Sequence, residues 1–202
     1  KKFMFDGIDL SKQSERQVRK LRGARISMVM QDPKFSLNPV LTIEDQIAEA
    51  LRTHQKLTRK ELDEKVLHML DQVRINDPAR VAKLYPHEVS GGMGQRIMIA
   101  MMLIPEPDLL IADEPTSALD VSVQAQVLDL IDNLIQEKGM GLILISHDLN
   151  LVANYADRVL VMNSGEIVEQ CNASELHKAT HPYTQGLLNA MPRIDETREE
   201  LP

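Results

Sequence analysis

The sequence predicts an α/β fold in which a mainly parallel β-sheet carries an inserted α-helical subdomain. Two apolar runs, at 109–112 and 142–145, lack polar alternation, as is typical of parallel strands covered on both faces. A helical pattern at 121–138 lies between them, and strand, helix, strand in this order forms a right-handed crossover. From 42 to about 83 the apolar residues instead recur with helical spacing, which indicates a helical lobe between two strands of the sheet.

The segment before the helical lobe predicts two extended stretches and one helix. Residues 3–10 form a strand with a turn, and the charged stretch 14–21 forms a helix. Residues 25–30 form an apolar strand, which ends before Pro33 because proline stops regular structure.

Two features mark helices within the lobe itself. Ile43, Ile47 and Leu51 share one helix face. Thr58 and Glu61 have the spacing of a capping box, which marks the start of a second helix.

The second half of the chain predicts two more helices and a β-hairpin. A methionine-rich helix runs from 90 to about 103 and ends before Pro105. Asp120 is expected to cap the next helix, and Gly139 to end it. Within 159–168, two strands form a hairpin that is expected to close the sheet.

Composition and charge argue against two classes of function. No apolar run reaches the roughly 18 residues that a membrane span needs, so any membrane role must be peripheral. The formal net charge of −7 argues against a bare nucleic-acid binder, since affinity for phosphate comes from clustered Lys and Arg. The single cysteine, Cys171, cannot form an internal disulfide, which suits a reducing compartment.

Three of the predicted strands end in polar residues. Gln31 follows the first, Asp113 and Glu114 follow the second, and Ser146 with His147 follows the third. In open parallel sheets, ligands bind at the carboxyl ends of the strands. We therefore expect these side chains to converge on one crevice.

These residue types suit the hydrolysis of a nucleotide. Asp113 can hold Mg²⁺, directly or through water, because a hard cation that bridges phosphates needs few protein carboxylates. Glu114 can act as general base toward the attacking water, and His147 can hold that water or the γ-phosphate. The alternatives are a solvated strand end for the acidic pair and a hydrogen-bonded structural role for His147.

Ser90, Gly91 and Gly92 stand at the predicted start of a helix. One interpretation is a serine N-cap followed by glycines that relax the turn. The other is an anion site, since backbone N–H groups without bulky side chains at a helix N-terminus suit a γ-phosphate. Both can hold together, and Asp120 likewise suits either a helix cap or a contact with the nucleotide.

In their order along the chain, these blocks resemble the nucleotide-binding domain of an ABC transporter, which has a RecA-like P-loop NTPase core. Gln31 resembles the family's Q-loop, and 90–92 resembles its signature motif. The block 112–115 resembles its Walker B strand with the catalytic glutamate, 117–120 its D-loop, and His147 its switch histidine. The resemblance implies that the chain binds ATP and Mg²⁺. It also implies that Gln31 contacts both the metal and the nucleotide.

The sequence is more narrowly similar to the bacterial importer branch for oligopeptides, dipeptides and nickel, in the blocks 31–33, 36–39, 85–88 and 181–184. This similarity implies an ATPase at the cytoplasmic face of the inner membrane that couples ATP hydrolysis to uptake of peptides or nickel. The implied partners are a second ATPase subunit, as a homo- or heterodimer, and two integral membrane permease subunits. A periplasmic solute-binding protein takes part indirectly, and no nucleic acid is involved.

The sequence departs from the family at three points. None of the nine glycines fits the family's phosphate loop, G-x-x-x-x-G-K-[ST] (Walker A). Met93 replaces the usual glutamine of the signature, and Gly94 replaces a larger, often basic residue at a cost of about 1 kcal/mol relative to alanine in a helix. We therefore expect an amino-terminally truncated cassette that hydrolyses ATP only at background rate on its own.

The resemblance divides the chain into four parts. These are a partial N-terminal part of the ATPase core up to the Q-loop, 1–34; the helical subdomain with the signature motif, 35–104; the C-terminal part of the core, 105–170; and a C-terminal helical extension, 171–202.

Two other functions fit the sequence less well. A soluble ABC-type ATPase of DNA repair or translation would usually carry coiled-coil insertions, zinc-binding cysteines or tandem ATPase halves. A non-catalytic assembly module would keep the fold without hydrolysis, and the presence of both Glu114 and His147 argues against it.

Overall fold

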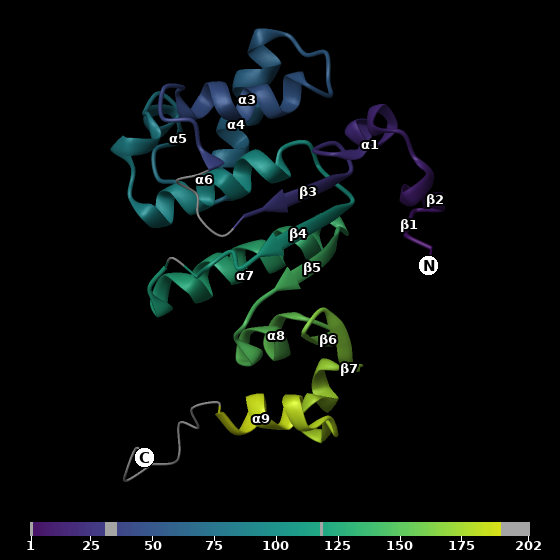
Figure 1. Cartoon of the computed structure of the whole chain (residues 1–202). Coiled ribbons are helices and arrows are strands. Elements are labelled where there is room, and N and C mark those ends of the chain that lie inside the picture. The colour runs from purple at the N-terminus through teal and green to yellow at the C-terminus, as the bar shows by residue number, and fades with distance from the viewer. Residues whose placement is uncertain (1, 31–35, 118, 191–202) are drawn as a thin grey trace. The chain divides into compact units, whose positions relative to one another are not determined.

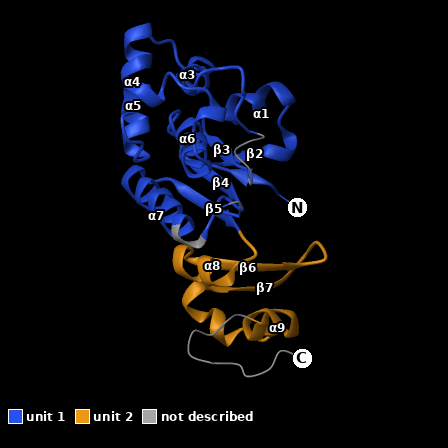
Figure 2. Ribbon diagram, turned by 90° about the vertical axis from the view of Figure 1, so that its left-hand side faces the viewer, with its two compact units in different colours: residues 1–145 blue, residues 146–202 orange. Residues whose placement is uncertain are grey.

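The structure is a computed structural model that describes residues 2–30, 36–117 and 119–190 (Figure 1). The chain forms two compact units, Lys1–Ile145 and Ser146–Pro202, called unit 1 and unit 2 below (Figure 2). Among the described residues, no helix combines the length and the hydropathy that a membrane span requires.

A three-stranded parallel sheet lies at the centre of unit 1. Its order is β3 (Ile26–Val29), β4 (Leu109–Asp113) and β5 (Gly141–Ile145), so β4 is the central strand. Helix α7 (Val121–Lys138) connects β4 to β5 along the chain. The parallel pairing and the connecting helix confirm what the apolar runs predict.

The start of unit 1 is a small antiparallel hairpin followed by short helices. Strands β1 (Met4–Phe5) and β2 (Ile8–Asp9) pair with each other, and η1 (Leu10–Lys12) and α1 (Glu15–Leu21) follow. The expected strand with a turn is thus two very short strands.

Arg25 ties this hairpin to the sheet. Its guanidinium pairs with Asp6 at 2.7 Å and with Asp108 at 2.5 Å, and it lies 5.1 Å from the centre of the Phe5 ring. Hydrogen bonds to Asp6 and then to Asp108 raise the pKa of Arg25 above its usual value. The pair with Asp6 therefore joins the hairpin to the start of β3, and the pair with Asp108 joins the start of β3 to that of β4.

The helical lobe is inserted between β3 and β4. It contains α3 (Ile43–Arg52), α4 (Arg59–Gln72), α5 (Pro78–Val81), η2 (Pro86–Glu88) and α6 (Gly91–Leu103). The helical periodicity predicted for 42–83 is therefore confirmed, and it corresponds to three helices, α3, α4 and α5.

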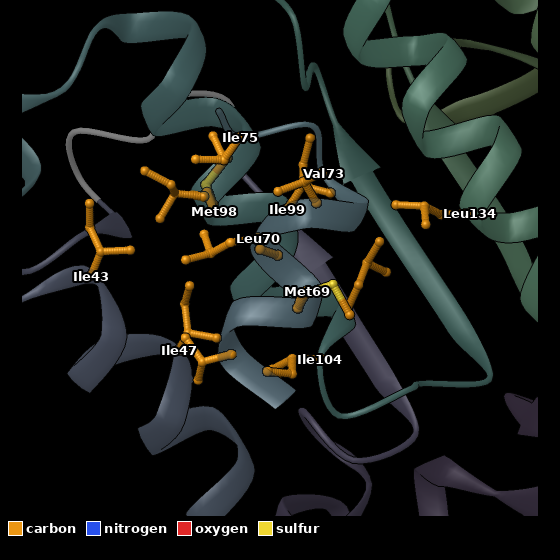
Figure 3. Packing of buried hydrophobic residues seen from close by; sticks show 14 of the residues in the cluster. Ile43, Ile47, Met69, Leu70, Val73, Ile75, Met98, Ile99, Ile104 and Leu134 are labelled. Carbon is orange, nitrogen blue, oxygen red and sulfur yellow. The ribbon is translucent and has the colours of Figure 1, made fainter. Parts of the chain in front are cut away.

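Buried side chains from α3, α4 and α6 form the core of the lobe (Figure 3). Ile47, Leu70, Met98 and Ile99 are each fully buried. The methionines of α6 thus include one that fills the core, as flexible thioether side chains do in irregular gaps.

The capping box at the start of α4 is present. The Thr58 hydroxyl accepts a hydrogen bond from the Glu61 N–H, and the Thr58 N–H donates to the Glu61 carboxylate at 2.8 Å. The Thr58 hydrogen bonds lower the pKa of Glu61 below its ordinary value.

The two faces of the sheet differ in burial. Leu110 is 0% exposed and belongs to a core cluster with side chains from α6 and α7. On the opposite face, Ile143 and Ile145 are 48% and 46% exposed, and Met28 is 40% exposed. The expectation that the strands are covered on both faces is wrong for β5, because α6 and α7 bury only the face that carries Leu110.

Unit 2 consists of short helices around a hairpin. Its elements are α8 (Leu149–Tyr155), β6 (Arg158–Asn163), β7 (Glu166–Asn172), η3 (Ala173–Lys178) and α9 (Pro182–Ala190).

The hairpin is antiparallel, as predicted, and its turn has φ of 51° at Ser164 and 83° at Gly165. Two consecutive positive φ values are typical of a type I′ hairpin turn. The expectation that the hairpin closes the sheet is wrong, since β6 and β7 form a separate two-stranded sheet within the described residues. Alternating residues and a turn define a hairpin, but they do not define the edge with which it pairs.

Candidate functional site

The acidic pair lies at the carboxyl end of the central strand of unit 1. Asp113 is the last residue of β4, is half-buried and is in register with Ile145 of β5. Glu114 follows with φ of 43°, a left-handed conformation that is uncommon outside glycine. The Glu114 N–H donates to the Ile145 carbonyl at 2.9 Å, which holds this turn against the end of β5.

The loop after Glu114 is held from two helices. Gln95 of α6 donates its side-chain amide to the Pro115 carbonyl. Gln124 of α7 donates to the Thr116 carbonyl at 3.1 Å and to the Leu119 carbonyl at 3.3 Å. Neither glutamine is among the sequence-predicted site residues. For Gln95 the signal in the sequence is an amide side chain within a helix that is otherwise mostly apolar. Gln124 has no such signal, since α7 carries many polar side chains.

The start of α6 has the structure expected of a serine cap. The Ser90 hydroxyl accepts a hydrogen bond from the Met93 N–H at 3.3 Å. A Cβ atom added to Gly91 would meet no heavy atom within 4 Å, so the space beside this turn is open. The helix continues through Gly94, whose N–H donates to the Ser90 carbonyl at 2.8 Å.

The start of α6 also approaches the start of α7. A Cβ atom on Gly92 would lie 3.3 Å from a methyl carbon of Val123, so glycine permits this close approach. Asp120 caps α7, and its carboxylate accepts from the Val123 N–H at 3.1 Å. The cap interpretation of Asp120 is therefore confirmed, and its contact with a nucleotide stays a prediction.

The structure does not place the remaining predicted residues next to the acidic pair. Gln31 lies outside the described residues, and Ser146 and His147 belong to unit 2. In unit 2, the Ser146 hydroxyl accepts from the Asp148 N–H at 3.0 Å, and Asp148 caps α8. The convergence of Gln31, Asp113, Glu114 and His147 on one crevice stays a prediction.

The donor set suits a hard cation that is held mainly by phosphates. Within the described ranges, no three His, Cys, Asp or Glu side chains are grouped as a metal site. A magnesium ion bound to nucleotide phosphates needs only one or two protein oxygen ligands, because it keeps waters and phosphate oxygens as the others. The half-buried Asp113 carboxylate fits this requirement.

The comparison with family models gives a direct match. Residues 2–117 match the model described as ABC transporter. This range contains the predicted Q-loop residue Gln31, the 90–92 segment and the acidic pair, and it confirms the resemblance stated from the motifs.

The curated relatives are ATP-binding proteins of importers. The chain is 53% identical over 192 residues to the glutathione import ATP-binding protein GsiA of Salmonella choleraesuis, covering 95% of this chain and 31% of that protein. It is 49% identical over 201 residues to the dipeptide transport ATP-binding protein DppD of Bacillus subtilis, covering 99% of this chain and 60% of that protein. The chain thus spans about a third to three fifths of the length of these relatives.

Solved structures of similar fold are ATP-binding cassettes. The dimeric post-hydrolysis structure of the ATP-binding cassette MJ0796, bound to ADP and Pi, matches with a TM-score of 0.74 and 26% identity over 84% of this chain and 72% of that chain. The cbiO1 structure from Clostridium perfringens, part of the ABC transporter complex cbiONQ, matches with a TM-score of 0.74 and 26% identity, over 93% of this chain and 72% of that chain. Together with the fold of unit 1, these matches show that the chain belongs to the ABC transporter family, as part of an ATP-binding domain.

Proposed function

We propose that this chain supplies most of the catalytic residues of an importer ATPase, which couples ATP binding and hydrolysis to uptake of a solute. The observation that carries the proposal is the acidic pair Asp113 and Glu114 at the carboxyl end of the central parallel strand. In open α/β sheets this edge is where ligands bind.

The two carboxylates would divide the work of hydrolysis. Asp113 holds Mg²⁺, directly or through water, with Gln31 as a further oxygen ligand. When bound, the ion neutralises charge on the β- and γ-phosphates. Glu114 orients the attacking water and accepts its proton, a role worth about 10²–10⁴-fold in rate. His147 holds the same water or the γ-phosphate.

The start of α6 would serve a second nucleotide. Ser90, Gly91 and Gly92 offer the positive end of a helix and, beside Gly91, open space, which suits the γ-phosphate of ATP bound to a second ATPase subunit. Asp120 would contact the nucleotide from the loop that precedes α7. The proposal therefore requires a dimer of ATPase subunits, either homomeric or heteromeric.

The proposal also requires a phosphate loop, which the 202 residues do not contain. Turnover is therefore expected of the complete ATPase and not of this chain alone. Within that protein, we assign 1–34 and 105–170 to the ATPase core, 35–104 to the helical subdomain and 171–202 to a helical extension.

The importer relatives support the solute and the partners that we propose. The solute is an oligopeptide or dipeptide, with nickel as the second choice, since two similar proteins are named for import of glutathione and of dipeptides. The partners are two integral membrane permease subunits and, indirectly, a periplasmic solute-binding protein. The ATPase would be peripheral, at the cytoplasmic face of the inner membrane, without nucleic acid.

The substitution Glu114→Gln in the complete ATPase tests this assignment. It removes the proton acceptor but keeps the size of the side chain, so steady-state ATP hydrolysis should fall about 10²-fold or more. ATP binding should persist, and size-exclusion chromatography should show an ATP-dependent dimer.

The matched control is Glu137→Gln, the same chemical change on the exposed face of α7, which should leave turnover unchanged. Wild-type turnover in the Glu114→Gln protein would remove Glu114 from the mechanism.

A further inference from the structure

A buried glutamine links the start of α6 to the loop that follows Glu114, which is called the catalytic loop from here on. Gln95 is 1% exposed, and its amide donates to the carbonyl of Pro115, a residue 20 positions further along the chain. A buried amide without a partner costs free energy, so this side chain needs that carbonyl to remain inside the core. The bond therefore resists separation of α6 from the loop.

The Pro115 carbonyl belongs to the residue directly after Glu114, so few rotatable bonds separate the two. The proline ring fixes φ of residue 115, so only the ψ angles of residues 114 and 115 can change the position of this carbonyl relative to the Glu114 Cα atom. The Glu114 N–H, on the other side of this residue, donates to the Ile145 carbonyl at 2.9 Å. On the Pro115 side, the Glu114 carbonyl accepts from the Ser117 N–H at 3.2 Å. A displacement of the Pro115 carbonyl must therefore rotate Glu114 or break one of these bonds.

The same helix contacts the loop region at a second place. Gly92 lies against Val123 in the first turn of α7, and Gln124 of that turn holds the carbonyls of Thr116 and Leu119. The first two turns of α6 are thus joined to both ends of the segment that follows Glu114.

Resting on the proposed function, we propose that Gln95 is a positioning residue for hydrolysis. It transmits the position of the α6 start, where a second subunit's nucleotide would bind, to Glu114 through the Pro115 carbonyl. Glu114 would then reach its working position only when the α6 start is held by that nucleotide.

The test is Gln95→Met in the complete ATPase. Methionine keeps the length of the side chain and favours a helix, but it cannot donate to Pro115. The kcat for ATP should fall about tenfold while the KM for ATP stays within about twofold, because the loss affects the transition state and not ATP binding. In the Glu114→Gln background, Gln95→Met should change the residual rate by less than about twofold.

Gln46→Met is the matched control. Gln46 is also a buried amide, 5% exposed, and it donates to the carbonyls of Asn38 and Leu41 at 3.0 Å, away from the catalytic loop. It should lower stability without lowering kcat. Equal losses of kcat for the two substitutions, or an undiminished Gln95→Met effect in the Glu114→Gln protein, would overturn the inference.

If Gln95→Met fails to fold, Gln95→Asn gives the same decision, because it retains the amide but is one methylene too short to keep the bond. A wild-type kcat for folded Gln95→Asn would overturn the inference. The outcomes also separate the two proposals: normal turnover of Glu114→Gln contradicts the proposed function, whereas normal turnover of Gln95→Met contradicts only this inference.

Discussion

Glu114 combines a strained backbone with a place at the candidate site. Its φ of 43° is a conformation that costs a non-glycine residue about 1–3 kcal/mol. Hydrogen bonds from its N–H to Ile145 and to its carbonyl from Ser117 hold it there. The backbone therefore turns sharply at Glu114, and in the proposed mechanism this turn would let two adjacent carboxylates serve a metal and a water separately.

The sequence could predict some site residues and not others. Asp113 and Glu114 could be proposed because they end an apolar strand, and Ser90 could be proposed because it precedes two glycines at a helix start. Their positions at the end of β4 and at the start of α6 are confirmed, and their roles stay predictions. Gln95 could not be proposed, because its role depends on a carbonyl that is close only after α6 and β4 have packed.

Cys171 is predicted to react slowly as a thiol. Burial, then the charges of Glu169 and Glu175, raise the pKa of Cys171 above its ordinary value. The thiolate, which is the nucleophile, is therefore scarce at neutral pH. Its rate of reaction with a disulfide reagent should be well below that of the unfolded chain at pH 7 and should rise steeply with pH.

Glu175→Gln supplies the control for this prediction. It removes one of the two charges, so the rise of the reaction rate should move to lower pH without a change in burial. A folded-state rate equal to that of the unfolded chain at pH 7 would contradict the prediction.

At the scale of elements, periodic patterns were sufficient for most of unit 1. The three parallel strands, α7 and the helices of the lobe follow from apolar spacing and caps, which act within a few residues. The exposure of β5 and the pairing of β6 with β7 depend on tertiary contacts between distant segments, and the local spacing of apolar residues does not specify those contacts.

The cap of α4 should make stability depend on pH. The pKa of Glu61 is lowered by the Thr58 hydrogen bonds, so its contribution is present above the unfolded-state value of 4.5. It is lost as the pH falls below 4.5 through the lower folded-state pKa. The urea midpoint of the wild type should therefore exceed that of Glu61→Gln at pH 7, and the difference should shrink toward pH 3.

Glu64→Gln, on the same helix but outside the cap, is the comparison for this measurement. Its urea midpoint should stay close to that of the wild type at pH 7 and at pH 3, because the ion pair of Glu64 with Lys60, at 3.8 Å, is exposed. A gap between wild type and Glu61→Gln that is constant from pH 7 to pH 3 would show that the charge of Glu61 does not contribute through the cap.

At the scale of the whole molecule, the exposed side of the sheet should be visible in solution. Ile143 and Ile145 of β5 present apolar surface on the same face of the sheet as Met28 of β3, and exposed apolar clusters of this kind bind hydrophobic dyes. The isolated chain should therefore increase the fluorescence of anilinonaphthalene sulfonate, and Ile143→Thr with Ile145→Thr should reduce that increase.

A matched substitution on the other side of the same strand separates this effect from general loosening. Leu144→Thr should destabilise the chain and increase dye fluorescence, since Leu144 points toward the partly buried side. Dye binding that is unaffected by the double isoleucine substitution would place the dye elsewhere.

The exposed Ile143 and Ile145 side chains also affect self-association of the isolated chain. At low ionic strength the net charge of −7 makes the molecules repel one another. Added salt screens this repulsion beyond about 3 to 10 Å, so that the exposed apolar surfaces of two sheets can associate. Light scattering by this chain should thus grow with salt, the reverse of what a charge-driven complex would do.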